Sequence, residues 1–147
     1  EKSPMPTARG MLSACAVKGK LYAIGGTLNF LSSSFDLVEV YDPLMDTWTT
    51  KSNMPTARVS ISTCTMMDKI FAIGGYAFPT MYNTNEMYNP GADKWVTKAP
   101  MQETRQTFFL GSVGNKIYAV GGSYPNPENP AEPVILSSIE EYDFSKD

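Results

Sequence analysis

Histidine is absent from the 147 residues of this chain. Its absence removes Ser-His and Cys-His nucleophile pairs, imidazole-bound zinc and the most common general base near neutral pH. Basic residues form no run and the formal net charge is −3, so no nucleic-acid footprint is visible. There is no apolar run of membrane-spanning length, no signal-like segment and no Asn-x-Ser/Thr sequon. We therefore expect a cytoplasmic protein whose partners are neither nucleic acid nor membrane.

Cysteine occurs only twice, at Cys15 and Cys64, which are 49 residues apart. Each lies six residues after an arginine, and Gly111 fills the corresponding third position. A disulfide needs Cα atoms within about 7 Å, whereas equivalent positions on neighbouring repeats are usually farther apart. The pattern therefore predicts two small buried residues with reduced thiols, as in a cytosolic protein.

Other catalytic signatures are equally scarce. Glu140 and Glu141 are adjacent, and neighbouring residues of a strand point to opposite faces, so we expect one structural and one solvated carboxylate. The pair Gly25-Gly26 follows an apolar run but opens no helical pattern, which argues against a phosphate-binding loop. The chain is thus expected to contain no catalytic residue, no cofactor and no metal site.

One spacing occurs three times in the chain. In each copy an arginine precedes a Gly-Gly pair by 16 residues, and a Glu-x-Tyr sequence follows the pair. In two copies a tryptophan lies 7 residues past the tyrosine. Self-similarity at a fixed period of about 20–50 residues marks a solenoid, propeller or array. The repeated residues are Arg9, Gly25, Gly26, Glu39, Tyr41 and Trp48; Arg58, Gly74, Gly75, Glu86, Tyr88 and Trp95; and Arg105, Gly121, Gly122, Glu140 and Tyr142.

Each copy also contains four short β-prone runs with turn signals between them. In the first copy these runs cover residues 12–17, 21–24, 37–41 and 47–50. Apolar residues show no sustained spacing of 3.6, so helices should be scarce. The pattern predicts four antiparallel strands per copy, which we call A to D.

Four short strands repeated at intervals of 49 and 47 residues resemble the kelch repeat, one blade of a β-propeller. The resemblance rests on the three Gly-Gly pairs, the three Glu-x-Tyr pairs and the two tryptophans, and it covers the whole chain. It implies an all-β fold of three four-stranded antiparallel kelch blades, about half of a propeller. The blades are expected at about residues 4–53, 54–100 and 101–147.

Most repeated residues have structural roles in this interpretation. The glycines let the chain turn tightly after strand B, because they adopt backbone conformations that are closed to other residues. The tyrosines and tryptophans offer large apolar faces to fill the wedge between blades. One arginine and one glutamate per copy predict an ion pair that ties the start of strand A to strand C, since a buried charge needs a partner.

The two ends of the chain indicate an incomplete ring. Residues 2–6 align with residues 51–55, so the chain begins at the end of a strand D, and the next tryptophan would fall at position 149. We therefore expect the third blade to lack its outer strand. Because open blade edges invite pairing, we expect either head-to-tail self-association of two copies into a six-bladed ring or a missing second half.

The B–C loops are the variable part of the repeat. Their spacing from the second glycine to the tyrosine is 15, 13 and 20 residues, and loops that vary on a constant scaffold usually carry function. In the peptide-binding propellers that the chain resembles, contacts recur just after the motif arginine and the glycine pair. These two criteria together select Met11, Thr27, Asn29, Phe30, Ser60, Tyr76, Phe78, Tyr82, Gln106, Thr107, Ser123 and Tyr124 as partner-binding residues. None is basic, which argues against an acidic ligand.

Three functional hypotheses follow. The resemblance implies a non-catalytic protein-interaction module, similar to the propeller of BTB-kelch adaptors, which binds a client while another domain recruits a ubiquitin ligase. The alternative is a fragment of a propeller enzyme acting on a sugar or other small molecule at the ring axis. A third hypothesis is a scaffold without a single partner. Separately, the structural alternative to binding is that the loop aromatics merely cover neighbouring blades.

Overall fold

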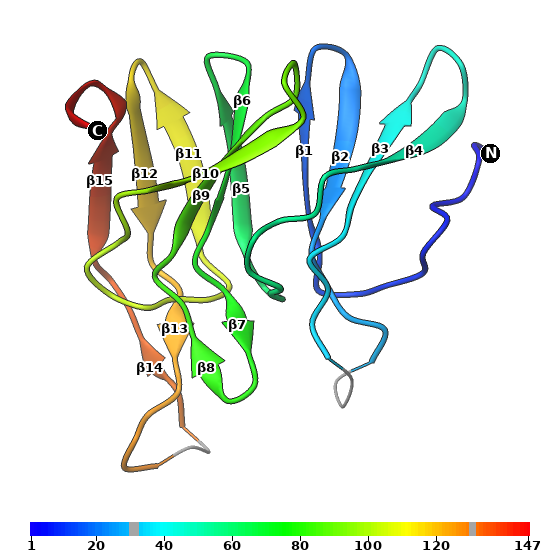
Figure 1. Ribbon diagram of the computed structural model, residues 1–147. Helices are drawn as coiled ribbons and strands as arrows, with labels where there is room; N and C mark the ends of the chain where they lie inside the picture. Colours follow the sequence, from blue (N-terminus) through cyan, green and yellow to red (C-terminus); the bar gives the residue numbers. More distant parts are fainter. Residues whose placement is uncertain (30–32, 130–131) are drawn as a thin grey trace.

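The structure is a computed structural model that describes residues 1–29, 33–129 and 132–147. Three antiparallel sheets stand side by side in chain order (Figure 1). The first sheet consists of β1 (Ser13–Val17), β2 (Lys20–Ile24), β3 (Val38–Asp42) and β4 (Thr47–Lys51). The second consists of β5 (Ser62–Met66), β6 (Lys69–Ile73), β9 (Asn85–Asn89) and β10 (Lys94–Lys98). The third contains β11 (Phe109–Val113), β12 (Lys116–Val120) and β15 (Ile139–Asp143).

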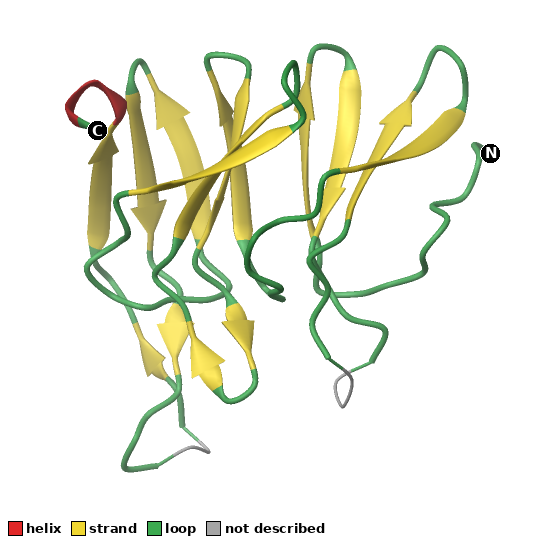
Figure 2. Cartoon of the chain, in the orientation of Figure 1, coloured by secondary structure: helices red, strands yellow, loops and turns green. Residues whose placement is uncertain are grey.

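Two small hairpins extend from the loops between strands B and C. They are formed by β7 (Tyr76–Ala77) with β8 (Thr80–Met81), and by β13 (Ser123–Tyr124) with β14 (Val134–Ile135). Both hairpins project from the same end of the sheets, opposite the short A–B turns (Figure 2). The last element along the chain is the 3-10 helix η1 (Phe144–Lys146). The described ranges contain no helix with the length and apolar character that a membrane crossing requires.

The predicted fold class is confirmed: the chain is all-β, its first two sheets are blades with strands in the order A, B, C, D, and the described part of the third sheet has A, B and C without the outer strand. Strand A of each blade, namely β1, β5 and β11, contacts strand A of its neighbour. Side chains bridge these strands, as where Ser112 Oγ donates a hydrogen bond to the Thr65 carbonyl at 2.8 Å. The A strands are therefore the inner edge from which the blades radiate.

The core lies between blades rather than within any one of them. Tyr88 is completely buried between the first two blades, where its ring lies 6.1 Å from that of Tyr22. Phe71 is completely buried between the second and third blades, 5.8 Å from the ring of Tyr142. Because the hydrophobic effect stabilises roughly in proportion to the apolar area removed from water, each blade depends on its neighbour for its stability.

Candidate partner-binding face

Arg58 shows how the repeated arginine is held. Its side chain is completely buried, and Nη2 donates to Glu86 Oε2 at 2.6 Å while Nη1 donates to the Gly74 carbonyl at 2.6 Å. Burial lowers the pKa of the guanidinium, and the charge of Glu86 opposes that shift. Since an unpaired charge would be very costly at this depth, Arg58 fastens strand A to strands B and C and is not free to contact a partner.

The same arrangement occurs in the other two blades. Arg9 pairs with Glu39, and its Nε donates to the Gly25 carbonyl at 2.8 Å. Arg105 pairs with Glu140 at 2.6 Å, and its Nη1 donates to the Gly121 carbonyl at 2.9 Å. The predicted arginine–glutamate ion pair is thus present in all three blades.

The residue two positions after each arginine adopts a left-handed backbone conformation, with φ of 54° at Met11, 50° at Ser60 and 52° at Thr107. Such a conformation costs a non-glycine residue about 1–2 kcal/mol, so the surrounding contacts must enforce it. Backbone hydrogen bonds run between blades at these positions, from Ser60 N to Met11 O at 2.9 Å and from Thr107 N to Ser60 O at 3.4 Å. The three residues form one ladder that links blade to blade.

We use the name loop face for the end of the molecule that carries the B–C loops and the segments leading into strand A. These are the described parts of residues 25–37, 74–84 and 121–138, together with residues 1–12, 52–61 and 99–108. In each blade an isolated antiparallel bridge joins the two kinds of segment. The bridges are Gly10–Thr27, Val59–Tyr76 and Gln106–Ser123. Residues that are distant in the sequence are therefore brought together here, as expected from the strand order.

The second blade carries the most prominent aromatic side chain of the loop face. Phe78 is 86% exposed at the tip of the β7–β8 hairpin, and its ring lies edge-on to Tyr76 at 6.4 Å. Tyr82 follows the hairpin in the sequence, and its ring covers the Arg58 guanidinium, with 5.9 Å between Cζ and the ring centroid. The hairpin therefore holds one aromatic ring in solvent on a base that is fixed to the blade core.

A cavity of about 430 Å³ opens beside this hairpin, between the first and second blades. It is lined by Ser33, Ser34, Pro55, Thr56, Ala57, Ala77, Phe78 and Tyr82. Among the described residues no Asp, Glu, Lys or Arg side chain lines it, so these residues offer a ligand aromatic surface, hydroxyl groups and backbone rather than charge. Phe78 and Tyr82, two of the residues predicted to bind a partner, therefore line the same cavity.

The other selected residues are more dispersed. Met11 is 37% exposed and Thr107 is exposed, whereas Ser60, Gln106, Ser123 and Tyr124 are half-buried. Thr27 is only 5% exposed, and its hydroxyl donates to the Asn29 carbonyl at 2.7 Å, so its side chain stabilises the loop. Asn29 is exposed, and Phe30 lies outside the described residues.

A repeated aspartate was missed by the sequence reasoning. Tyr88 Oη donates to Asp93 Oδ1 at 2.5 Å, and Asp93 also accepts from the Ser52 amide of the preceding blade at 3.0 Å. Trp95 Nε1 donates to the Ser52 carbonyl at 2.9 Å, which completes the link between the two blades. The signal was available, because an aspartate lies five residues after each motif tyrosine.

The two cysteines lie in surroundings that disfavour the charged thiolate form. Burial raises the pKa of the Cys15 thiol to about 11, and that of the Cys64 thiol is raised in the same way to about 12. Both cysteines are free. Within residues 1–29, 33–129 and 132–147, no three His, Cys, Asp or Glu side chains gather closely enough to hold a metal ion.

Antiparallel sheets that contact one another through their A strands, each fastened by one buried arginine, are the blades of a β-propeller. The kelch-motif family model matches residues 8–55, 57–102 and 105–147. The chain therefore belongs to the kelch-repeat family.

A comparison with solved structures agrees with this assignment at the level of the fold. The structure titled "Structure of YjhT" superposes with a TM-score of 0.82 at 16% sequence identity, covering 98% of this chain and 52% of that one. The chain thus spans about half the length of that solved protein. At this identity the likeness shows the fold alone. A comparison with curated proteins found no match.

Proposed function

We propose that this chain is a non-catalytic protein-interaction module that binds a partner protein or peptide through its loop face. Kelch repeats are commonly protein-interaction modules. The observation that carries the proposal is the position of Phe78, which is 86% exposed at the rim of an uncharged cavity. A large apolar ring presented to solvent on a fixed hairpin is typical of an interaction anchor.

The chemistry of the loop face defines the expected ligand. Tyr76, Phe78 and Tyr82 supply rigid aromatic area, and Ser33 and Ser34 supply small hydrogen-bonding groups. Such a mixture suits the recognition of a peptide segment, because aromatic rings lose little conformational entropy on binding. Since no basic side chain is found among the described residues that line the cavity, we expect an uncharged or apolar segment rather than an acidic one.

The same proposal includes completion of the ring by further blades. The hydrogen bonds of the ladder all run from one blade to the blade before it: the Thr107 amide donates to the Ser60 carbonyl, and the Ser60 amide donates to the Met11 carbonyl. A following blade would donate to the Thr107 carbonyl in the same manner. Two copies associated head to tail, or a second half of similar length, would continue the ladder into a closed ring of six blades.

By analogy with BTB-kelch adaptors, the module would serve as the substrate-recognition part of a ubiquitin-ligase adaptor in the cytoplasm. The free thiols of Cys15 and Cys64 support a reducing compartment. The adaptor role rests on the family analogy, whereas the binding role rests on the loop face itself.

The decisive experiment compares partner capture by the wild-type chain with capture by the triple variant Tyr76→Ala/Phe78→Ala/Tyr124→Ala. Proteins captured by the wild type should be lost, and the affinity of a purified partner should fall at least about tenfold, as removal of anchor residues implies. The control is Leu44→Ala, because Leu44 is 93% exposed on the C–D turn, at the opposite end of the sheets. The melting temperatures of both variants should stay near the wild-type value. Equal capture by the triple variant would refute the assignment.

A further inference from the structure

The charges that the loop face presents to a ligand have one sign. Each motif arginine is completely buried and paired with the glutamate of its strand C. The only lysine in the loop-face segments is Lys2. It lies beside the C–D turn of the first blade, because the Ser3 amide donates to Asp46 Oδ1 at 3.0 Å. Apart from Glu1 next to Lys2, the remaining charged residues of these segments are Asp36, Glu103, Glu128 and Glu132.

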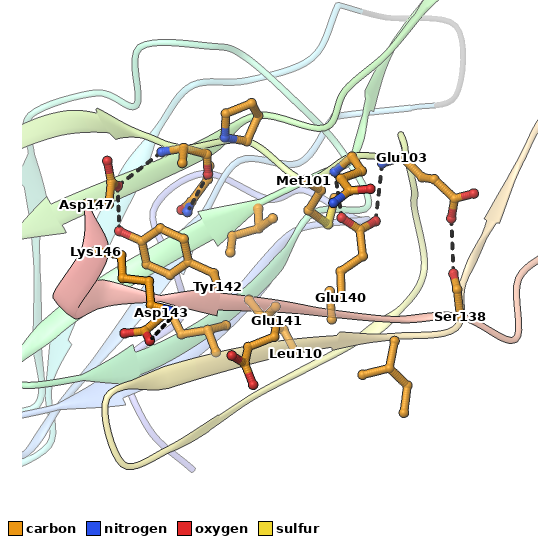
Figure 3. Close-up of a pocket in the computed structure, with 18 residues that line it drawn as sticks. Met101, Glu103, Leu110, Ser138, Glu140, Glu141, Tyr142, Asp143, Lys146 and Asp147 are labelled. Atoms are coloured by element: carbon orange, nitrogen blue, oxygen red, sulfur yellow. Dashed lines mark hydrogen bonds and ion pairs between the residues drawn. The ribbon is translucent and has the colours of Figure 1, made fainter.

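The third blade departs from the repeat two residues before its arginine. The first two blades have a threonine at this position, and in the second blade the Thr56 hydroxyl donates to the motif glutamate at 2.7 Å. The third blade has Glu103 instead, which accepts from Ser138 Oγ at 3.0 Å (Figure 3) and from Arg105 Nη2 at 3.3 Å. Because Arg105 also pairs with Glu140, two carboxylates share one cation and one negative charge stays uncompensated.

This uncompensated charge is accessible to a ligand. The side chain of Glu103 is 49% exposed, whereas that of Glu140 is 17% exposed. Glu128 and Glu132 are also exposed, in the described parts of the loop between β13 and β14, and this hairpin projects from the loop face (Figure 2). The third blade therefore presents three carboxylates on the loop face.

The acidic segment lies beside the uncharged cavity of the loop face. Phe78 and Tyr82 line that cavity. The Arg105 amide donates to the Tyr82 carbonyl at 3.4 Å, so the segment that leads into the third blade contacts a residue of the cavity wall. Glu103 is two residues from Arg105, and two residues of chain span at most about 7 Å. One extended peptide can therefore reach the cavity and the carboxylate together.

The two junctions between blades thus differ in chemistry although they share one repeat. Residues 55–57, with the sequence Pro-Thr-Ala, line the cavity at the first junction. The corresponding residues 102–104 at the second junction have the sequence Gln-Glu-Thr. An apolar site and an acidic site therefore lie one blade apart on the same face. Such an asymmetric arrangement of charge favours one orientation of a ligand and excludes ligands of the wrong charge.

We propose that the loop face recognises a peptide segment in which an apolar side chain lies a few residues from lysine or arginine residues. The apolar side chain enters the uncharged cavity against Phe78. The basic side chains pair with Glu103 and with Glu128 and Glu132 of the third blade. This inference rests on the proposed function and deepens it, because it assigns the ligand a charge and a direction across the blades.

The first test selects ligands from a phage-displayed library of random linear peptides. The library is panned on the full 147-residue chain, with counter-selection on Phe78→Ala. Enriched peptides should carry an aromatic or aliphatic residue with lysine or arginine on one side of it. Phe78-dependent peptides without an excess of basic residues would overturn this inference and leave the proposed function standing. If no peptide depended on Phe78, both would be wrong.

Charge variants of the chain then test where the basic side chains bind. The selected peptide, labelled with fluorescein, is titrated by fluorescence anisotropy. Glu128→Gln/Glu132→Gln should weaken binding at least about threefold and flatten its salt dependence, since exposed charge pairs contribute modestly and are screened. The control Asp68→Asn/Glu141→Gln removes two exposed carboxylates outside the loop face and should leave the affinity unchanged. Equal weakening by the two double variants would refute the assignment.

Glu103→Gln tests the carboxylate nearest the cavity. Arg105 keeps its ion pair with Glu140 in this variant, so the melting temperature should stay near the wild-type value. The variant should bind the selected peptide more weakly, but it should bind a peptide whose basic residues are replaced by glutamine as well as the wild type does. Such non-additivity in a double-mutant cycle indicates direct contact. Additive effects would show that Glu103 does not contact the basic residues, contrary to the proposal.

A second copy of the chain is the competing occupant of the loop face. Sedimentation of the wild type and of Phe78→Ala, each with and without the selected peptide, distinguishes the two. A loop face that is free to bind the peptide, with the same sedimentation for both chains, supports the proposal. If the wild type forms a dimer that Phe78→Ala abolishes and that the peptide does not dissociate, the face accepts a second copy and the proposal is wrong.

Discussion

Tyr88 and Asp93 are joined by a hydrogen bond of 2.5 Å that spans the C–D turn of the second blade. Asp93 uses the same carboxylate oxygen to accept from the Ser52 amide, which belongs to the segment leaving the first blade. The tyrosine–aspartate pair therefore fixes a turn and joins two blades at once. Equivalent pairs occur at Tyr41 with Asp46 and at Tyr142 with Asp147.

This pair predicts a pH dependence of stability. The hydrogen bond from Tyr88 and the amide of Ser52 lower the pKa of Asp93 below its ordinary value of 3.8. The ionised carboxylate thus stabilises the fold above the unfolded-state pKa, and this stabilisation is lost as the pH falls through the lower folded-state pKa. In Asp93→Asn the acid limb of the stability curve should be shallower. Urea titrations between about pH 2 and 6 would measure the change.

Tyr88→Phe tests the cause of that shift. It removes the hydrogen bond that lowers the pKa of Asp93 most, while most of the buried ring is kept. The acid limb of the stability curve should therefore become shallower, as in Asp93→Asn. The aspartates of the other two blades would leave a residual slope in both variants. If neither variant changed the slope, Asp93 would not be coupled to folding through this contact.

Breaking the Arg58–Glu86 ion pair should be strongly destabilising. Arg58→Met leaves Glu86 as an unpaired charge that is 2% exposed, and loss of one partner of a buried pair costs about 3–5 kcal/mol. The control is Lys18→Met, since Lys18 pairs with Asp68 on the surface with 62% of its side chain exposed. That change should stay within about 0.5 kcal/mol. Urea denaturation compares the two, and an unaltered midpoint in Arg58→Met would show that the arginine is not structural.

The strands could be predicted from the sequence because their signals are local. Residues 21–24 were expected as a strand, and β2 covers Lys20–Ile24, since the β-prone run and the following glycines lie within a few residues of each other. The arginine–glutamate pairs were also accessible, because one charge of each sign recurs in every copy and neither can be buried alone.

The loop face was less accessible to sequence reasoning. The β7–β8 hairpin has only two paired positions, and the bridge from Val59 to Tyr76 that supports it comes from a different segment. The sequence could not show that Thr27 is buried and Phe78 is exposed, because side-chain direction in a loop depends on contacts with neighbouring blades. The spacing of the repeated residues therefore located the B–C loops, but it did not show which loop side chains are exposed to a partner.

A side chain at Gly74 should be destabilising for two reasons, backbone strain and a clash with the next blade. Its φ is +66°, and an added Cβ would lie 2.5 Å from the Arg105 carbonyl oxygen of the next blade. Gly114 has a similar φ of +59°, but a Cβ added there would meet nothing within 4 Å, so this position isolates the strain. Gly114→Ala should cost about 1–2 kcal/mol, and Gly74→Ala clearly more, because the blades must also separate. Equal urea midpoints for the two variants would argue against close packing at Gly74.

The two thiols should be inert in the folded chain. Burial raises the pKa of Cys15 to about 11 and that of Cys64 to about 12, so the thiolate that reacts with disulfide reagents is scarce at neutral pH. Labelling with a coloured aromatic disulfide near neutral pH should be slow and should accelerate sharply when urea unfolds the chain. Cys64 is 8% exposed and Cys15 is more accessible, so Cys64→Ser should retain the faster of the two slow phases. Rapid stoichiometric labelling of the native chain would show that the strands around these thiols open readily, contrary to their position between packed blades.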